Sequence, residues 1–95
     1  MNVIFLGENI VENNKKVWQV EIKNKIINLT KSEYFILKFL YDRKDIRVAG
    51  YIINNEVLPN AKLEYINWKI IPSINEKCEN IILETRIGNC YYIEG

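Results

Sequence analysis

The chain has 95 residues, of which 48% are hydrophobic and 26% are charged, and its formal net charge is +1. This composition is ordinary for one folded domain, and it excludes a disordered segment or a strongly basic nucleic-acid-binding tail. No apolar run approaches the roughly 18 residues of a membrane-spanning helix, and the polar N-terminus lacks the basic start of a signal peptide. We therefore expect a single domain over residues 1–95, in the cytoplasm, with no membrane contact.

The N-terminal third of the sequence has the pattern of antiparallel strands. A short apolar run, VIFLG, ends at Gly7. In the segment VWQVEI, the side chains of Trp18, Val20 and Ile22 lie on one side of a strand and form the expected core face. The polar residues KNK then predict a turn into the next strand, IINL, so residues 17–29 form a predicted hairpin.

Two helices are predicted next. In TKSE, Thr30 can cap a helix while Glu33 reaches back to the Thr30 amide, which is the reciprocal capping box. The helix that follows, YFILKFLY, is apolar nearly all round, so it is expected to be covered on more than one face. After the loop DRKDIR, a second short helix is predicted over residues 49–58, and the Pro59-Asn60 pair ends it.

The third predicted helix, KLEYINWKIIPSINEK, covers residues 62–77. Its apolar residues recur at spacings of three and four, so they lie on one face; they are Leu63, Ile66, Ile70 and Ile74. The opposite face carries Tyr65, Trp68, Lys69 and Pro72. Because a proline inside a helix removes an amide donor and crowds the preceding turn, the helix should kink or loosen at Pro72.

The C-terminal segment predicts a β-hairpin over residues 81–93. IILETR and CYYI are its strands, and Gly88-Asn89 supply the positive backbone φ angles of a tight turn. The expected fold is α+β, with strands over residues 1–29, three helices over 30–77 and this hairpin at the end. Three helices followed by a hairpin are typical of the winged helix-turn-helix arrangement, in which the hairpin is the wing.

Three stretches, in this order, resemble the output domains of OmpR/PhoB-type response regulators. INLTKSEYFILKFL is similar to the LT-x-x-E stretch that opens the helical part of those domains, VAGYIINNEVLPN to their second helix, and ETRIGNCYYI to their closing hairpin. The resemblance covers residues 27–93 and implies a winged helix whose third helix enters the major groove of DNA. Because the 95 residues start with methionine and include no receiver domain, we expect an output domain that stands alone.

By this resemblance, the chain is a DNA-binding transcriptional regulator whose partner is double-stranded DNA. The candidate DNA contacts are Lys62, Asn67, Lys69 and Ser73 on the third helix and Thr85 and Arg86 on the wing. The third helix has no arginine, which is the commonest reader of guanine. Residues 61–95 hold four basic and five acidic side chains, a net charge of −1. DNA binding would therefore be weak and would depend on a few phosphate contacts.

The outer face of the third helix favours an alternative function, a protein-interaction or dimerisation module. Tyr65, Trp68, Ile71 and Pro72 stand where the related family carries basic residues. Tyrosine and tryptophan are typical anchors of protein interfaces. The partner would be a second copy of the chain, which is the simplest form, or another protein. The sequence leaves both functions open.

The sequence lacks the usual motifs of catalysis. It has no histidine, no motif-bearing nucleophile, no paired-carboxylate motif and no phosphate-binding loop. Cys78 and Cys90 do not have the spacing of a metal site, and in a reducing cytoplasm we expect two free thiols. We therefore predict no enzymatic activity, cofactor, metal site or small-molecule substrate.

Overall fold

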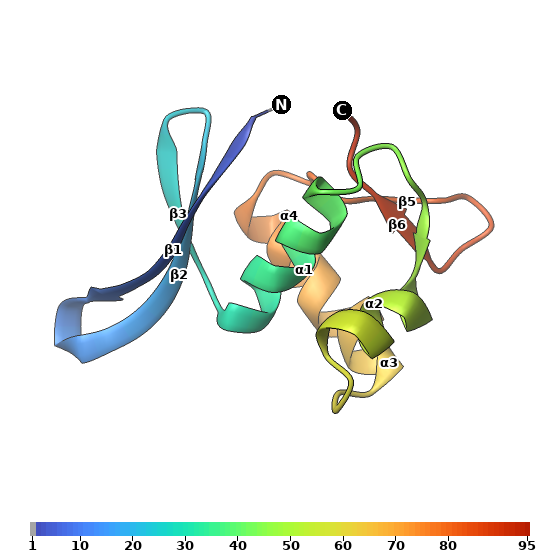
Figure 1. The fold of residues 1–95 in the computed structure, drawn as a ribbon, viewed down its shortest axis with the longest axis horizontal. Coiled ribbons are helices and arrows are strands. Elements are labelled where there is room, and N and C mark those ends of the chain that lie inside the picture. Colours follow the sequence, from blue (N-terminus) through green and yellow to red (C-terminus); the bar gives the residue numbers. More distant parts are fainter. Residues whose placement is uncertain (1) are drawn as a thin grey trace.

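The computed structural model describes residues 2–95, in which two small sheets flank a group of helices (Figure 1). The strands are β1 (Val3–Val11), β2 (Lys15–Ile22), β3 (Lys25–Leu29), β4 (Val48–Ala49), β5 (Leu83–Glu84) and β6 (Cys90–Tyr92). The helices are α1 (Lys31–Tyr41), α2 (Gly50–Val57) and a third helix made of α3 (Leu63–Tyr65), η2 (Ile66–Ile70) and α4 (Ile71–Lys77). A 3₁₀ turn, η1 (Glu12–Asn14), joins β1 to β2. The predicted α+β class, with an N-terminal antiparallel sheet and three helices, is confirmed.

The N-terminal sheet has the strand order β1-β2-β3, and both pairings are antiparallel. Lys23 and Asn24 have positive φ angles, as a tight two-residue turn requires, so the predicted hairpin over residues 17–29 is confirmed. The prediction that the first strand ends at Gly7 is wrong. The register with β2 shifts at Leu6, which forms a bulge between Phe5 and Gly7, and pairing resumes at Gly7, whose φ is 84°. Glycine allows the strand to bend there without ending.

Aromatic side chains join the N-terminal sheet to α1. The ring centre of Tyr34 lies 5.3 Å from that of Phe5 and 5.1 Å from that of Trp18. The first of these contacts is edge-on, a favoured arrangement for aromatic rings. Val20 and Ile22 are buried on the same face of the sheet, as the sequence predicts, while Trp18 is half-buried.

The third helix contacts α1, α2 and β3, and it buries one face in the core. Ile66, Ile70 and Ile74 are at most 4% exposed. The middle segment, η2, is π-helical: the N–H of Ile71 donates to the carbonyl of Ile66, five residues back. This wider turn ends at Ile70, and its last donor, the N–H of Ile71, directly precedes Pro72, which has no N–H to continue a regular helical ladder. The loosening predicted at Pro72 takes this form.

The second sheet lies on the other side of the helices, with the strand order β4-β6-β5 (Figure 1). Strands β5 and β6 come from the predicted C-terminal hairpin, and Gly88 and Asn89 have the predicted positive φ angles. Strand β4 was not predicted. It is two residues long, and it forms because Val48 and Ala49 pair with residues more than 40 positions later in the chain. Two residues carry no periodicity that a sequence could reveal.

Candidate interaction surface

Five exposed residues of the third helix form a surface that we call the aromatic face. They are Glu64, Tyr65, Trp68, Lys69 and Pro72. Trp68 is 74% exposed and Tyr65 is 55% exposed. Because residues four apart lie on the same side of a helix, Glu64, Trp68 and Pro72 form one ridge, and Tyr65 and Lys69 form a second. Exposed aromatic side chains gathered on one helix are typical of a surface that binds another macromolecule.

Ile71 does not belong to this face, although the sequence predicted it there. Its side chain is 5% exposed and packs in the core with Ile70 and Ile74. Ile71 follows Asn67 by four positions and lies on the same side of the helix, which is turned toward α2 and β6. The third helix therefore buries more than one apolar stripe, because packing elements cover it on several sides.

Asn67, a candidate DNA contact, points into the molecule, whereas a base contact requires an outward side chain. The hydroxyl of Tyr91 donates a hydrogen bond to Asn67 Oδ1 over 2.8 Å. Burial, together with the charge of Glu84 and with Cys90, raises the pKa of Tyr91 to about 12, so the phenol stays a donor at neutral pH. Gly50 makes room for the amide, because a Cβ atom there would lie 2.8 Å from Asn67 Oδ1.

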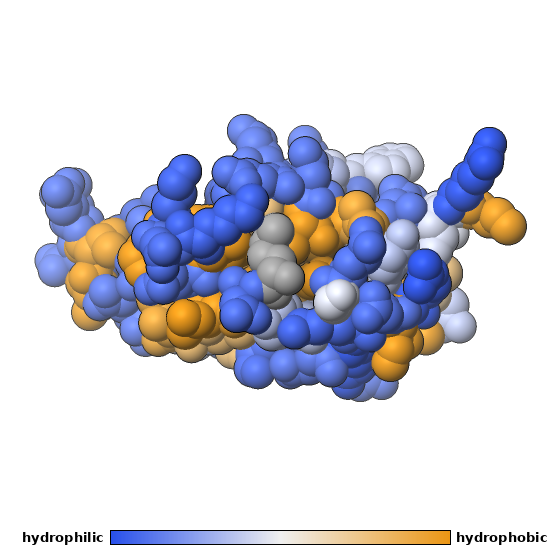
Figure 2. Space-filling model, turned by 90° about the horizontal axis from the view of Figure 1, so that it is seen from above, coloured by the Kyte–Doolittle hydropathy of each residue, from blue (hydrophilic) through white to orange (hydrophobic). Residues whose placement is uncertain are grey.

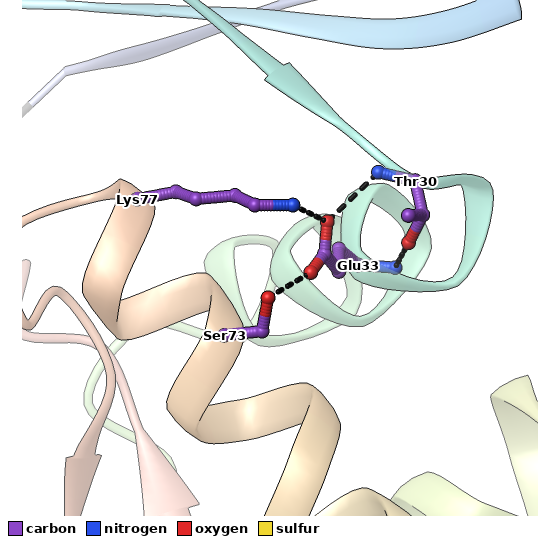
Figure 3. A network of polar contacts seen from close by, with 4 residues as sticks. All are labelled: Thr30, Glu33, Ser73 and Lys77. Atoms are coloured by element: carbon purple, nitrogen blue, oxygen red, sulfur yellow. Dashed lines mark hydrogen bonds and ion pairs between the residues drawn. The ribbon is translucent and has the colours of Figure 1, made fainter.

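Ser73 is also engaged inside the protein, in a polar network around Glu33 (Figure 3). The hydroxyl of Ser73 donates to Glu33 Oε2, and Lys77 Nζ lies 2.7 Å from Glu33 Oε1. The Thr30 amide donates to Glu33 Oε1 over 2.8 Å, and the Glu33 amide donates to Thr30 Oγ1 over 3.2 Å. The predicted capping box is therefore confirmed. Ser73, a candidate DNA contact, instead uses its hydroxyl within the protein, because a buried carboxylate needs its hydrogen bond.

Glu33 is the one buried charged residue among residues 2–95, and it is 4% exposed. Burial by itself raises the pKa of this carboxyl group, since the charged form loses its hydration. The hydrogen bonds from Lys77, Ser73 and the Thr30 amide outweigh burial and lower the pKa of Glu33 below its usual value of 4.5. Glu33 is therefore an ionised group that ties the third helix to the start of α1.

The remaining residues predicted to contact DNA come from two elements, the third helix and the loop between β5 and β6. Lys62 precedes the third helix as its N-cap and Lys69 is on the aromatic face; both are exposed. Thr85 is half-buried and Arg86 is exposed, and both belong to the loop between β5 and β6. Ile87, beside them, is 99% exposed. The structure thus leaves three exposed cations and no exposed amide or serine of the predicted set to read bases.

Two arginines from the loop after α1 stack on rings of the chain itself. The guanidinium carbon of Arg43 lies 3.7 Å from the ring centre of Phe39, and that of Arg47 lies 4.1 Å from the ring centre of Tyr92. Such cation–π contacts hold a side chain in place while leaving its charge partly hydrated. These cations are on a different segment from the aromatic face and do not make that face basic.

The outer face of the N-terminal sheet is a second exposed apolar region. Figure 2 shows hydrophobic surface at the end of the molecule that this sheet forms. Ile4 and Ile26 are exposed on this face, where both pair with Glu21, and Leu6 is exposed at the bulge of β1. A row of amides crosses the face: Asn9 donates to Gln19 over 3.1 Å, and Gln19 donates to Asn28 over 2.9 Å. This polar row interrupts the surface, and the sheet exposes no aromatic ring comparable to Trp68.

The chain matches no protein-family model, and no functionally characterised protein matches it significantly. None of the helices in residues 2–95 is long and apolar enough to cross a membrane. The same residues hold no group of three or more His, Cys, Asp or Glu side chains placed to bind a metal. Cys78 and Cys90 are both free thiols, as predicted. Function must therefore be inferred from the surfaces of the chain itself.

The sequence pointed to some parts of this surface and missed others. The exposure of Tyr65, Trp68 and Pro72 follows from helical periodicity and was predicted. Glu64 was not singled out, although its spacing of four from Trp68 places it on the same ridge. The partners of Glu33 were also missed, because Ser73 and Lys77 are 40 and 44 residues away in the sequence.

Proposed function

We propose that the chain is a winged-helix domain that acts as a protein-interaction module, with the aromatic face as its binding surface. The observation that carries this function is that Trp68 and Tyr65 are exposed together on one helix while Asn67 and Ser73 point inward. Burying a tryptophan and a tyrosine against a partner removes a large apolar area from water, and such residues dominate the energetics of protein interfaces.

The order of the elements supports the winged-helix part of the proposal. Three helices precede the hairpin β5–β6, and β4, between α1 and α2, adds a third strand to that hairpin. The loop of residues 85–89 is the wing, and it extends away from the helices (Figure 1). The resemblance of residues 27–93 to OmpR/PhoB-type output domains agrees with this arrangement.

DNA-binding regulation is the second candidate function, and the exposed cations favour it. Lys62, Lys69 and Arg86 are all exposed and can pair with phosphates. Against it, the third helix has no arginine and Glu64 lies on the same face as Lys69. A regulator built this way would bind DNA weakly, with each phosphate contact adding roughly 0.9 to the slope of log affinity against log salt.

Site-specific photo-crosslinking in an extract of the cells that produce the protein tests the proposed function. One variant carries a photoreactive phenylalanine analogue at position 68, and the control carries it at position 26, an exposed site on the N-terminal sheet. The extract is treated with nuclease so that DNA cannot bridge two proteins. We expect protein adducts from position 68 and none, or far fewer, from position 26.

A DNA titration at low and at high salt accompanies the crosslinking. We expect weak binding that fades at high salt and that shows no preference among DNA sequences. Absence of protein adducts at position 68, together with tight and sequence-selective DNA binding by the monomer that Trp68→Ala leaves unchanged, would overturn the proposed function and support the regulator.

A further inference from the structure

The exposed residues in the first half of the third helix have a symmetric order, with two rings in the middle and opposite charges at the two ends. Glu64 and Tyr65 are exposed, the next two residues point inward, and Trp68 and Lys69 are exposed. The order is charge, ring, ring, opposite charge. Among residues 2–95, neither Glu64 nor Lys69 forms an ion pair within the chain. Two rings and two unpaired charges of opposite sign are thus available together.

This order is complementary to itself when two such helices meet antiparallel about a two-fold axis. With the axis between positions 66 and 67, residue 64 of one copy lies level with residue 69 of the other, and residue 65 lies level with residue 68. Glu64 then comes beside the other copy's lysine and Tyr65 beside its tryptophan. A two-fold interface repeats every contact, so each copy contributes both halves of both pairs.

A parallel arrangement of the same two helices does not have this property. It would bring Glu64 level with Glu64 and Lys69 level with Lys69, and such like-charge pairs disfavour association. The charges of the aromatic face therefore select the antiparallel orientation.

We propose that the occupant of the aromatic face is a second copy of the chain, bound antiparallel through Glu64, Tyr65, Trp68 and Lys69. This inference rests on the proposed function, and it names the partner. Each copy contributes two rings, so four rings meet at the interface centre, where aromatic pairs pack offset or edge-on. Four residues per copy make a small interface compared with the roughly 800 Å² per partner of stable complexes. The dimer is therefore weak and depends on protein concentration.

Charge reversal tests the pairing directly. In the Glu64→Lys variant both positions are basic, and in the Lys69→Glu variant both are acidic, so each variant alone should associate at least ~tenfold more weakly than the parent. A mixture of the two variants, and the double variant E64K/K69E alone, restore every opposite-charge pair and should associate like the parent. The measurement is sedimentation velocity over a range of concentrations, with one variant carrying a fluorescent label in the mixture.

Both residues are exposed, so these substitutions leave the fold intact, and thermal unfolding of each variant checks this. Single variants that associate as well as the parent would overturn the pairing, and so would a mixture that stays monomeric. A parent that remains monomeric at every concentration would overturn the second copy as partner. In that case protein adducts at position 68 in the extract would still uphold the proposed function, and their absence would remove both.

Discussion

Ser73 donates a hydrogen bond to Glu33 across 40 positions of sequence, and this contact fixes the third helix against the first turn of α1. The same carboxylate accepts from Lys77 and from the Thr30 amide, so the helix cap and the helix packing share one charged group. A residue whose sequence position suggests DNA contact thus holds the fold together. Tyr65 and Lys69 of the aromatic face lie on the same line of the helix as Ser73, and they line the same pocket as Glu33 and Ser73.

Replacing Ser73 by alanine should destabilise the protein. The change leaves Glu33 Oε2 without its donor, and a hydrogen bond to a charged group is worth about 1.5 kcal/mol at the low end of its range. Glu76→Ala is the matched control, because Glu76 is exposed on the same helix and should change the free energy of unfolding by less than about 0.5 kcal/mol. Chemical denaturation measures both. Equal stability of the two variants would show that the Ser73 contact contributes nothing.

Acidification should weaken the protein through Glu33. Its pKa is lower in the folded state than the usual 4.5, so the folded state holds the proton less tightly than the unfolded state does. The resulting stabilisation is fully present above pH 4.5 and is lost as the pH falls through the lower folded pKa. The free energy of unfolding, measured from neutral pH downward, should therefore drop below this point. In Glu33→Gln this part of the drop should disappear, and a drop of unchanged size would contradict the assignment to Glu33.

Removing the hydroxyl of Tyr91 should destabilise the contact between the third helix and β6. Tyr91→Phe leaves Asn67 Oδ1 without its 2.8 Å hydrogen bond, and the expected loss is about 1 kcal/mol. Tyr92→Phe is the control, because Tyr92 is half-buried and donates no hydrogen bond among those that residues 2–95 form. If both variants unfold at the same denaturant concentration as the parent, then Asn67 does not depend on Tyr91 for its inward position.

The two thiols should react at very different rates. Burial raises the pKa of Cys78 to about 11, helped by the charge of Glu33, whereas Cys90 is half-buried in the second sheet. Since the thiolate is the reactive form, alkylation at neutral pH should modify Cys90 first and Cys78 only on unfolding. Mass spectrometry after timed quenching identifies the modified residue. Early modification of Cys78 in the folded protein would show that this core is open to solvent.

The helical part of the fold follows closely from the sequence, because its signals are local. The capping box at Thr30 and Glu33 and the four-residue spacing of Ile66, Ile70 and Ile74 each lie within a few turns of chain. The second sheet could be predicted only in part. Its hairpin has a turn signal at Gly88, whereas strand β4 exists only through its pairing with β6.

The candidate surface was less predictable than the fold for a related reason. Periodicity locates Trp68 outside and Ile66 inside, yet it cannot tell how wide the buried side is. Ile71 and Asn67 lie at the edge of the buried face of the helix. This edge is buried because Asn67 packs against Tyr91 and Gly50. Those contacts join segments far apart in the chain, and a single sequence does not contain them.

The most direct test of the aromatic face as a site for a second copy is a dilution series followed by two-dimensional ¹H–¹⁵N NMR of the purified chain. We predict that, as the protein is diluted, the amide signals of Glu64, Tyr65, Trp68 and Lys69 and the indole signal of Trp68 shift together. Signals of the N-terminal sheet, such as Ile26, should stay in place. Spectra that do not change on dilution, or shifts confined to the N-terminal sheet, would contradict the proposed dimer.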